Sequence, residues 1–304
     1  MKIAVFGGTG FVGNYLIDEL IKNNYKLNVL VRSGNKSKLE NKDKCTLFIG
    51  DISNRDVVEE IIKNSDVVIY NIGIIREFKS IGITYEKLHY QGAKLTIDIS
   101  KKYNIHRFIL MSANGVDQNR TNYQITKLKS EVYLKNNIKN WTIIRPSLIF
   151  GDPNGKKEFC SELKKDMLSL PLPAPAFFKG LNIMSAGKFE MSPIHIKDVA
   201  VILVKSINNC HAFKKIYDLG GEKYNWKEII KIISKACNKN KFIIPAPTFF
   251  IYGLALLFDK YAWFPISRDQ LSMLLMGNVC DSRTLFKRYN IIPIKFNYKS
   301  LDYL

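Results

Sequence analysis

The sequence predicts an α/β fold, a doubly wound parallel sheet with helices on both faces, followed by a smaller C-terminal α+β capping region. Over residues 1–150, short apolar runs alternate with segments of helical periodicity, which is the pattern of a parallel sheet. A glycine-rich turn follows the first apolar run, and the alternation stops after residue 150. We expect one domain over 1–150 and a smaller substrate or partner region over 151–304, interleaved with the first.

Six strands and the helices between them are expected in the first domain. The expected strands are 3–6, 27–31, 46–49, 67–70, 108–111 and 141–144, and the expected helices are 14–23, 57–62, 85–102 and 123–135. Each strand is a short apolar run, and each helix has apolar residues at helical spacing. The polar connection between the second and third strands is expected to be weakly helical.

Prolines mark the start of the capping region. The run 170–175 contains three prolines, so it lacks the backbone donors that a helix or a central strand needs. Residues 170–178 either line an apolar substrate pocket or close the crevice of the sheet domain. Further along, we expect helices over 197–208 and 226–236 and a strand over 216–219.

A glycine motif, Gly7-x-x-Gly10-x-x-Gly13, separates the first strand from the first helix. Gly7 permits the sharp turn, Gly10 lets a pyrophosphate approach the backbone, and Gly13 lets helix and strand pack closely. The helix N-terminus adds N–H groups and a positive dipole end. This context predicts a Rossmann-type dinucleotide site, the alternative being a tight turn without a ligand. The expected contacts are Gly7, Thr9, Gly10, Phe11, Val12 and Gly13.

The ends of the later strands extend this predicted site. Arg32 and Ser33 follow the second strand, where an acidic residue usually binds the ribose 2′-hydroxyl of NAD. A cation there suits a 2′-phosphate, which favours NADP(H) over NAD(H), unless Arg32 is only a solvated loop residue.

Asp51 and Ile52 follow the third strand. The carboxylate can accept a hydrogen bond from adenine, with Ile52 against the ring; alternatively, Asp51 caps the next helix, and both roles are compatible. Asn71, Gly73 and Pro146 follow later strands and complete the expected cofactor contacts.

Ser112, Tyr123 and Lys127 are the candidate catalytic residues. Tyr123 and Lys127 are four residues apart on one helix, and Ser112 ends the strand before it. Hydride transfer to or from a carbonyl needs a proton donor or acceptor at the oxygen, and a nearby cation can lower the pKa of a tyrosine. We expect Tyr123 to move the proton, Ser112 to orient the oxygen, and Lys127 to stabilise the phenolate and bind the nicotinamide ribose.

Charge and cysteine content narrow the functional classes. The chain has 304 residues and a net charge of +19, but its lysines are scattered and no nucleic-acid-binding motif accompanies them. We therefore expect no nucleic-acid partner, while attraction to anionic membranes or phosphate-bearing ligands stays open. The widely spaced cysteines favour neither a metal site nor disulfides.

The first strand begins at residue 2, and no apolar run reaches the ~20 residues of a membrane span. We therefore expect a cytoplasmic protein, with peripheral attachment to the inner membrane as an option.

Aromatic residues are concentrated over 242–264. At helical spacing, Phe250, Leu254 and Leu257 share one face. The favoured interpretation is the core of the capping region, and the alternative is a surface for a membrane or a partner protein.

Together, these motifs resemble the extended and atypical short-chain dehydrogenase/reductase superfamily. Other segments resemble one branch of it, which contains the NADPH-binding accessory subunit of respiratory complex I (alpha subcomplex subunit nine) and its bacterial relatives. These segments are 88–93, 107–115, 144–151, 193–200, 217–221 and 269–279. The resemblance covers nearly the whole chain. His89 is a departure, because extended-family enzymes usually carry asparagine there.

Three functional hypotheses follow. The first is an NADP(H)-dependent oxidoreductase that acts on a hydrophobic carbonyl or quinone-like substrate. The second, which the resemblance implies, is a non-catalytic NADPH-binding subunit or assembly factor of respiratory complex I. The third, from fold kinship alone, is a sugar-nucleotide epimerase or dehydratase.

Overall fold

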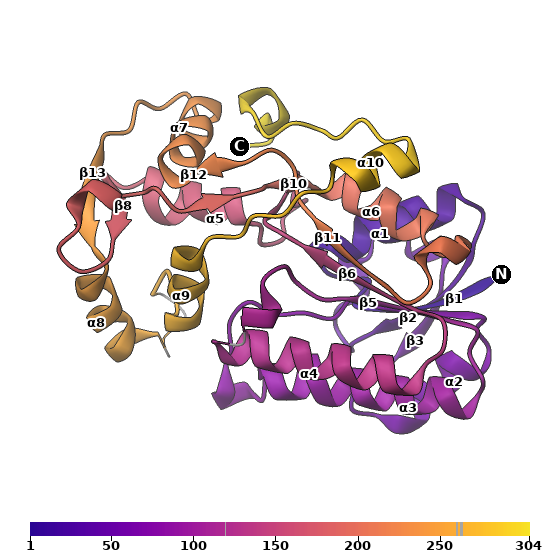
Figure 1. Cartoon of the computed structure of the whole chain (residues 1–304). Coiled ribbons are helices and arrows are strands. Elements are labelled where there is room, and N and C mark those ends of the chain that lie inside the picture. Colours follow the sequence, from indigo (N-terminus) through magenta and orange to yellow (C-terminus); the bar gives the residue numbers. More distant parts are fainter. Residues whose placement is uncertain (119, 260, 262–263) are drawn as a thin grey trace. The chain divides into compact units, whose positions relative to one another are not determined.

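The computed structural model describes residues 1–118, 120–259, 261 and 264–304. The chain forms two compact units (Figure 1). Unit 1 comprises Met1–Pro146, Ile196–Leu219 and Arg283–Ile291; unit 2 comprises Ser147–His195, Gly220–Ser282 and Ile292–Leu304.

Unit 1 is built on a seven-stranded sheet in the order β11-β6-β5-β4-β1-β2-β3, and all neighbouring strands run parallel. The strands are β1 (Lys2–Phe6), β2 (Lys26–Val31), β3 (Thr46–Ile49), β4 (Val67–Tyr70), β5 (Arg107–Met111), β6 (Trp141–Pro146) and β11 (Lys215–Leu219). The order reverses between β1 and β4, which is the switch point where doubly wound sheets bind ligands. The predicted fold class is confirmed.

Helices cover both faces of this sheet. Figure 1 shows three helices on one face, α1 (Phe11–Lys22), α6 (Ile196–Lys205) and α10 (Arg283–Tyr289). On the other face are α2 (Arg55–Lys63), α3 (Gly92–Lys102) and α4 (Asn122–Asn137). Their apolar sides pack against the buried strands. The central strands β1, β4 and β5 are therefore almost entirely apolar after their first residues.

Arg107 in β5 helps to hold a late segment of the chain in unit 1, where β11 pairs with β6. Its buried guanidinium donates to the carbonyl oxygens of Ser206 at 2.9 Å and Ile207 at 3.2 Å. It also donates to the carbonyl of Asn140 at 2.9 Å. Because these acceptors lie in separate loops, one buried cation satisfies several backbone groups and joins the end of α6 to the sheet.

The predicted helix over 85–102 is confirmed, but its first part is π-helical. A π-helical turn, Glu86–Gln91, precedes α3, which begins at Gly92. A Cβ atom at Gly92 would lie 2.5 Å from the Tyr70 hydroxyl and 2.8 Å from Ile52 Cγ1. The helix therefore approaches the sheet closely here, and His89 is the buried residue of the π-helical segment. The polar connection forms two 3₁₀ turns, Lys36–Lys38 and Lys42–Lys44.

Unit 2 consists of three two-stranded sheets and four α-helices in its described part. The strands pair as β7 (Ile149–Phe150) with β10 (Ile194–His195), β9 (Glu190–Met191) with β12 (Tyr224–Asn225), and β8 (Ala174–Phe178) with β13 (Ile243–Pro247). The helices are α5 (Phe159–Leu163), α7 (Trp226–Ala236), α8 (Thr248–Phe258) and α9 (Arg268–Met276). The proline-rich run thus leads into β8, which belongs to a two-stranded sheet. Both strands of such a sheet are edge strands, so the prolines do not occupy a central strand.

Trp226 anchors the core of unit 2. Its ring stacks on Phe189, with centroids 5.6 Å apart, and its indole N–H donates to the carbonyl of Pro175 at 2.8 Å. Buried Ile229, Ile230 and Ile233 follow on the same face of α7. Of the described helices, none has the length and apolar character needed to cross a bilayer.

Candidate functional site

The glycine turn after β1 lies against the end of β4. Gly7 has a φ of +95°, and a Cβ atom there would lie 2.8 Å from the carbonyl carbon and oxygen of Asn71. The Asn71 amide N–H donates to the carbonyl of Phe6 at 2.8 Å, and its side chain donates to the carbonyl of Gly7 at 3.4 Å. Only glycine satisfies both the left-handed backbone and the close approach at this position.

The N-terminus of α1 follows directly. Gly10 is its N-cap residue with extended backbone, and no side chain caps the helix. A Cβ atom at Gly13 would lie 2.2 Å from the Gly7 carbonyl oxygen, whereas at Gly10 the nearest atom would be 3.6 Å away. Gly13 is therefore required by packing, but the side of Gly10 is open. An uncapped helix N-terminus beside an open glycine fits a pyrophosphate.

The loop that follows β4 is fixed by groups from two helices. His89 Nε2 accepts a hydrogen bond from the Ile74 N–H at 3.1 Å, so its proton lies on Nδ1, facing the Thr126 hydroxyl at 3.1 Å. Burial, and then the charge of Lys127, hold the pKa of His89 well below its ordinary value. His89 is thus a neutral residue that positions the loop.

The Lys127 ammonium reaches from α4 to the ends of β4 and β5, and Ser112 directly follows β5. The Lys127 ammonium donates to the carbonyls of Met111 at 2.9 Å and Ile72 at 3.3 Å. A Cβ atom at Gly73 would lie 3.3 Å from this ammonium. The Ser112 hydroxyl is buried and has no hydrogen-bond partner among the described residues. A buried hydroxyl without a partner fits a ligand oxygen, because leaving it unsatisfied costs free energy.

Tyr123 lies on α4 among aromatic rings. Its ring packs edge-on against His89 and Tyr85, with centroid distances of 5.2 Å and 5.6 Å. Burial raises the pKa of Tyr123 to about 12. Burial also lowers the pKa of Lys127 to about 8, against the opposing charge of Glu131. The phenol therefore holds its proton at neutral pH in this structure.

Asp51 and Ile52 lie beside a cavity of about 290 Å³. Its lining includes Ile52, Lys87 and Gln91, so the π-helical turn forms one wall. The Asp51 carboxylate accepts hydrogen bonds from the Ser53 amide at 3.1 Å and hydroxyl at 2.7 Å. Lys87 lies 3.7 Å from the same oxygen. A partly apolar cavity with a carboxylate on the residue next to Ile52 suits an adenine ring.

The pKa of Asp51 is lowered overall. Burial acts to raise it, but the hydrogen bonds from Ser53 and the charges of Lys87 and Arg32 outweigh burial. The interpretation of Asp51 as the cap of the next helix is wrong. Asn54 is the N-cap of α2, and its side chain accepts from the amides of Asp56 and Val57.

Arg32 and Ser33 are exposed residues just beyond β2. The Arg32 carbonyl accepts a hydrogen bond from the Asn35 N–H at 3.0 Å, which closes a tight turn. Its charge acts on Asp51, so both residues lie at the same edge of the sheet. Pro146 ends β6, where its carbonyl accepts from the Asn114 N–H at 2.9 Å.

Several residues of this site carried no recognisable signal in the sequence. Lys87 and Gln91 line the cavity from the π-helical segment. A Cβ atom at Gly8 would lie 2.7–2.8 Å from side chains of α1 and β2. Buried Glu131 binds Arg145 through two hydrogen bonds, of 2.9 Å and 2.7 Å. This pair neutralises a carboxylate one helical turn from Lys127.

In the described part of the chain, no cluster of His, Cys, Asp or Glu could hold a metal ion.

A glycine turn at the switch point of a parallel sheet, with an open helix N-terminus above it, defines a dinucleotide-binding protein of the Rossmann type. The family model described as NAD(P)H-binding matches residues 7–168, more than half of the chain. The chain belongs to this NAD(P)H-binding family, and its cofactor is a nicotinamide dinucleotide. The prediction of a nicotinamide dinucleotide cofactor is confirmed.

Relatives match nearly the whole chain. It is 25% identical to the mitochondrial NADH-ubiquinone oxidoreductase 40 kDa subunit of Neurospora crassa, over 99% of this chain and 78% of the relative. It is 24% identical to NADH dehydrogenase (ubiquinone) 1 alpha subcomplex subunit 9 of Dictyostelium discoideum, over 88% and 73% of the two chains. The predicted resemblance to the complex I branch is confirmed.

Solved structures share the fold. UDP-glucuronic acid 4-epimerase from Bacillus cereus, in complex with UDP-glucuronic acid and NAD, superposes with a TM-score of 0.73 and 20% identity. The match covers 100% of this chain and 98% of the epimerase. At this identity the likeness shows the fold alone.

The contrast between Gly10 and Gly13 gives a first prediction. We expect Gly10→Ala to fold normally but to lose at least about tenfold in NADPH affinity, about 1.4 kcal/mol, because its methyl group faces the pyrophosphate position. Gly13→Ala should lower the melting temperature, since its Cβ meets backbone at 2.2 Å. Gly253→Ala is the control, because a Cβ atom at Gly253 would have no neighbouring atom within 4 Å. Calorimetry and thermal melting measure both effects; unchanged NADPH affinity in Gly10→Ala would contradict the assignment.

The buried ammonium of Lys127 gives a second prediction. Its pKa is lowered to about 8, so the charged form is disfavoured in the folded state. Stability should therefore rise as pH increases from about 8 towards the unfolded pKa of about 10.5. Relative to Lys127→Met, we expect the free energy of unfolding of the native chain to gain about 2 kcal/mol between pH 8 and pH 10. Urea denaturation measures this, and a difference independent of pH would contradict it.

Proposed function

We propose that the protein is an NADP(H)-dependent oxidoreductase that reduces a hydrophobic carbonyl or quinone-like substrate. The observation that carries this proposal is the Ser112 hydroxyl, buried and unpartnered among the described residues, at the strand ends that Lys127 joins. Such a hydroxyl is suited to a substrate oxygen. When bound, the cofactor supplies a hydride from its nicotinamide ring.

The proton chemistry follows from the state of Tyr123. With its pKa raised to about 12 by burial, the phenol is protonated at neutral pH and can donate to an oxygen that gains negative charge. This favours reduction of a carbonyl over oxidation of an alcohol. Ser112 would donate a hydrogen bond to the same oxygen, and Lys127 would hold the ribose. The rings of Tyr85 and His89 around Tyr123 favour an apolar substrate.

The preference for NADP(H) over NAD(H) is also a proposal. Arg32 is exposed, carries no acidic neighbour in sequence, and lies at the edge where the adenosine ribose of a dinucleotide is bound in this fold. A guanidinium binds a phosphate through two parallel hydrogen bonds, whereas it gains little from a ribose hydroxyl.

A second candidate function is an NADPH-binding accessory subunit or assembly factor of respiratory complex I. Two observations favour it. The complex I relatives match this chain almost from end to end. In addition, burial alone accounts for the high pKa of Tyr123, so the charge of Lys127 does not activate the phenol here. Such a protein would work in the cytoplasm, peripherally on the inner membrane, with the dinucleotide as a structural element.

Tyr123→Phe separates the two candidates. As the proton donor of a reductase, Tyr123 should contribute about 100-fold or more to turnover, while NADPH affinity stays the same. The assay follows NADPH oxidation with decylubiquinone and a panel of aromatic aldehydes, with UDP-glucose plus NAD as the epimerase control. If the native protein binds NADPH yet oxidises it with none of these, and complex I subunits co-purify with both forms, the accessory role replaces the enzymatic one.

Arg32→Ala tests the cofactor preference. Removing a charge-assisted hydrogen bond to phosphate costs about 1.5–3 kcal/mol, so NADPH affinity should fall about 10- to 150-fold. NADH affinity should change little, because NADH lacks the 2′-phosphate. Lys26→Ala, an exposed cation at the opposite end of β2, is the matched control. An equal loss for both cofactors would show that Arg32 does not recognise the 2′-phosphate.

A further inference from the structure

Helix α8 in unit 2 is apolar yet exposed. Its residues Thr248–Phe258 include no charged side chain, and Ala255 alone among them is buried. Phe249 is 69% exposed, and the exposed set comprises Phe249, Phe250, Tyr252, Gly253, Leu256 and Leu257. Their spacing places them on one side of the helix. A surface helix normally presents charged residues to water, so α8 has the opposite pattern.

The ribbon formed by β8 and β13 carries further exposed apolar residues. β13 leads directly into α8, and Phe178 at the end of β8 pairs with Pro247. The segment after β8 includes Leu181, which is 99% exposed, together with Ile183 and Met184. We call residues 167–189 and 238–258 the apolar ribbon.

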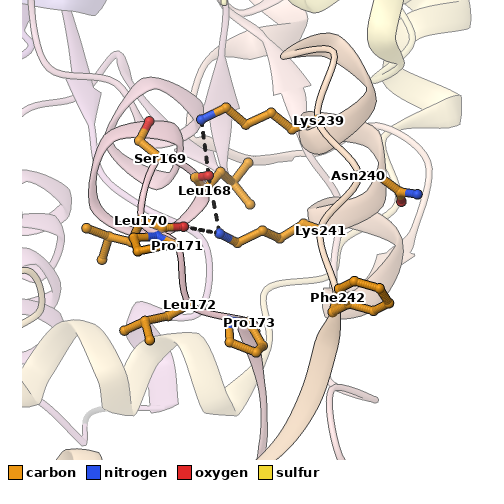
Figure 2. A pocket seen from close by; sticks show the side chains of 10 residues that line it. All are labelled: Leu168, Ser169, Leu170, Pro171, Leu172, Pro173, Lys239, Asn240, Lys241 and Phe242. Atoms are coloured by element: carbon orange, nitrogen blue, oxygen red, sulfur yellow. Dashed lines mark hydrogen bonds between the residues drawn. The ribbon is translucent and has the colours of Figure 1, made fainter.

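At the other end of the ribbon is a pocket of about 370 Å³ that brings two ammonium groups together. Figure 2 shows Lys239 and Lys241 pointing across it toward the opposite segment. Both donate to the carbonyl of Leu168 at 3.3 Å, and Lys241 also donates to the carbonyl of Leu170. An ammonium has three donors, so each lysine keeps at least one for an anion.

The rim of this pocket is apolar. Phe242 is 81% exposed beside the lysines, and Leu170 and Leu172 are exposed on the opposite segment. Figure 2 shows Leu172, Pro173 and Phe242 along one edge of the pocket. Two cations above an apolar rim match the border between phosphate groups and acyl chains in a lipid leaflet.

The charge of the ribbon supports the same occupant. Residues 167–189 and 238–258 contain four lysines and neither aspartate nor glutamate, while Asp166, Glu190 and Asp259 border them directly. Two of these bordering carboxylates are paired with cations, Glu190 with Lys223 and Asp259 with Arg268. A protein partner would need acidic side chains to match these lysines and a shaped apolar surface to match α8. A leaflet of anionic phospholipid supplies both properties without a shaped surface.

We propose that the apolar ribbon docks this protein on the surface of an anionic phospholipid bilayer. Helix α8 is about 16 Å long, too short to span a bilayer of about 30 Å, so it lies in the interface with Phe249, Phe250, Leu256 and Leu257 among the acyl chains. Lys239 and Lys241 bind lipid phosphates. The inference rests on the proposed peripheral location and names the surface and the lipid class.

Vesicle flotation tests the proposal with the full chain. The probes are vesicles of phosphatidylcholine alone and vesicles that also contain phosphatidylglycerol. We expect binding to the anionic vesicles that is at least about tenfold tighter than to neutral ones. Phe249→Ser/Phe250→Ser should lose about tenfold or more on anionic vesicles, since two exposed aromatic side chains no longer enter the acyl region. Ile292→Ser, at an exposed apolar position outside the ribbon, is the control.

Lys239→Gln/Lys241→Gln tests the electrostatic part. Each lysine near an anionic surface contributes about fivefold in affinity, so the double variant should lose about 30-fold and respond less to salt. Lys231→Gln/Lys299→Gln, at exposed positions outside the ribbon, is the matched control. Melting temperatures of all variants identify any loss through unfolding.

NADPH affinity is measured on the same samples. Absence of vesicle binding with intact NADPH affinity overturns the docking surface and leaves the nucleotide function standing. Equal binding by the ribbon variants and their controls would also overturn it. A further outcome would assign the surface to a second copy of the chain instead. In that case the native chain self-associates and does not bind lipid, and Phe249→Ser/Phe250→Ser abolishes the self-association.

Discussion

The contact between Gly7 and Asn71 is the constraint on which the nucleotide-binding unit depends. Here the first strand ends against the end of β4, at the point where the strand order reverses. The two backbones are so close that a side chain on Gly7 would collide with the Asn71 carbonyl, so the position of one strand end fixes the other. The turn therefore aims the N-terminus of α1 at the place where a pyrophosphate is bound in doubly wound folds.

The loop after β4 transmits this constraint to the candidate catalytic residues. His89 accepts from its backbone, and Lys127 donates to one of its carbonyls and to the end of β5. A neutral histidine and a buried lysine thus hold the same loop. His89 also faces the Thr126 hydroxyl, so its ring links this loop to α4.

The two units use their apolar residues differently. In unit 1, helices on both faces bury the central strands of the sheet. In unit 2, Trp226 organises a compact core, but the ribbon of β8 and β13 with α8 leaves large apolar side chains in water. Such exposure costs free energy in an isolated protein, which is why we assign this surface to an interface.

The sequence by itself determined the sheet, the glycine turn and the dinucleotide, because these depend on local patterns: apolar runs, helical spacing and glycines at fixed intervals. Tertiary structure alone decided the π-helical segment before Gly92, the Asn54 cap that displaced Asp51 from that role, and the cavity lined by Ile52 and Lys87. It also decided that α8 is exposed. Periodicity indicates which residues of a helix share a face, but what covers that face depends on segments distant in the chain.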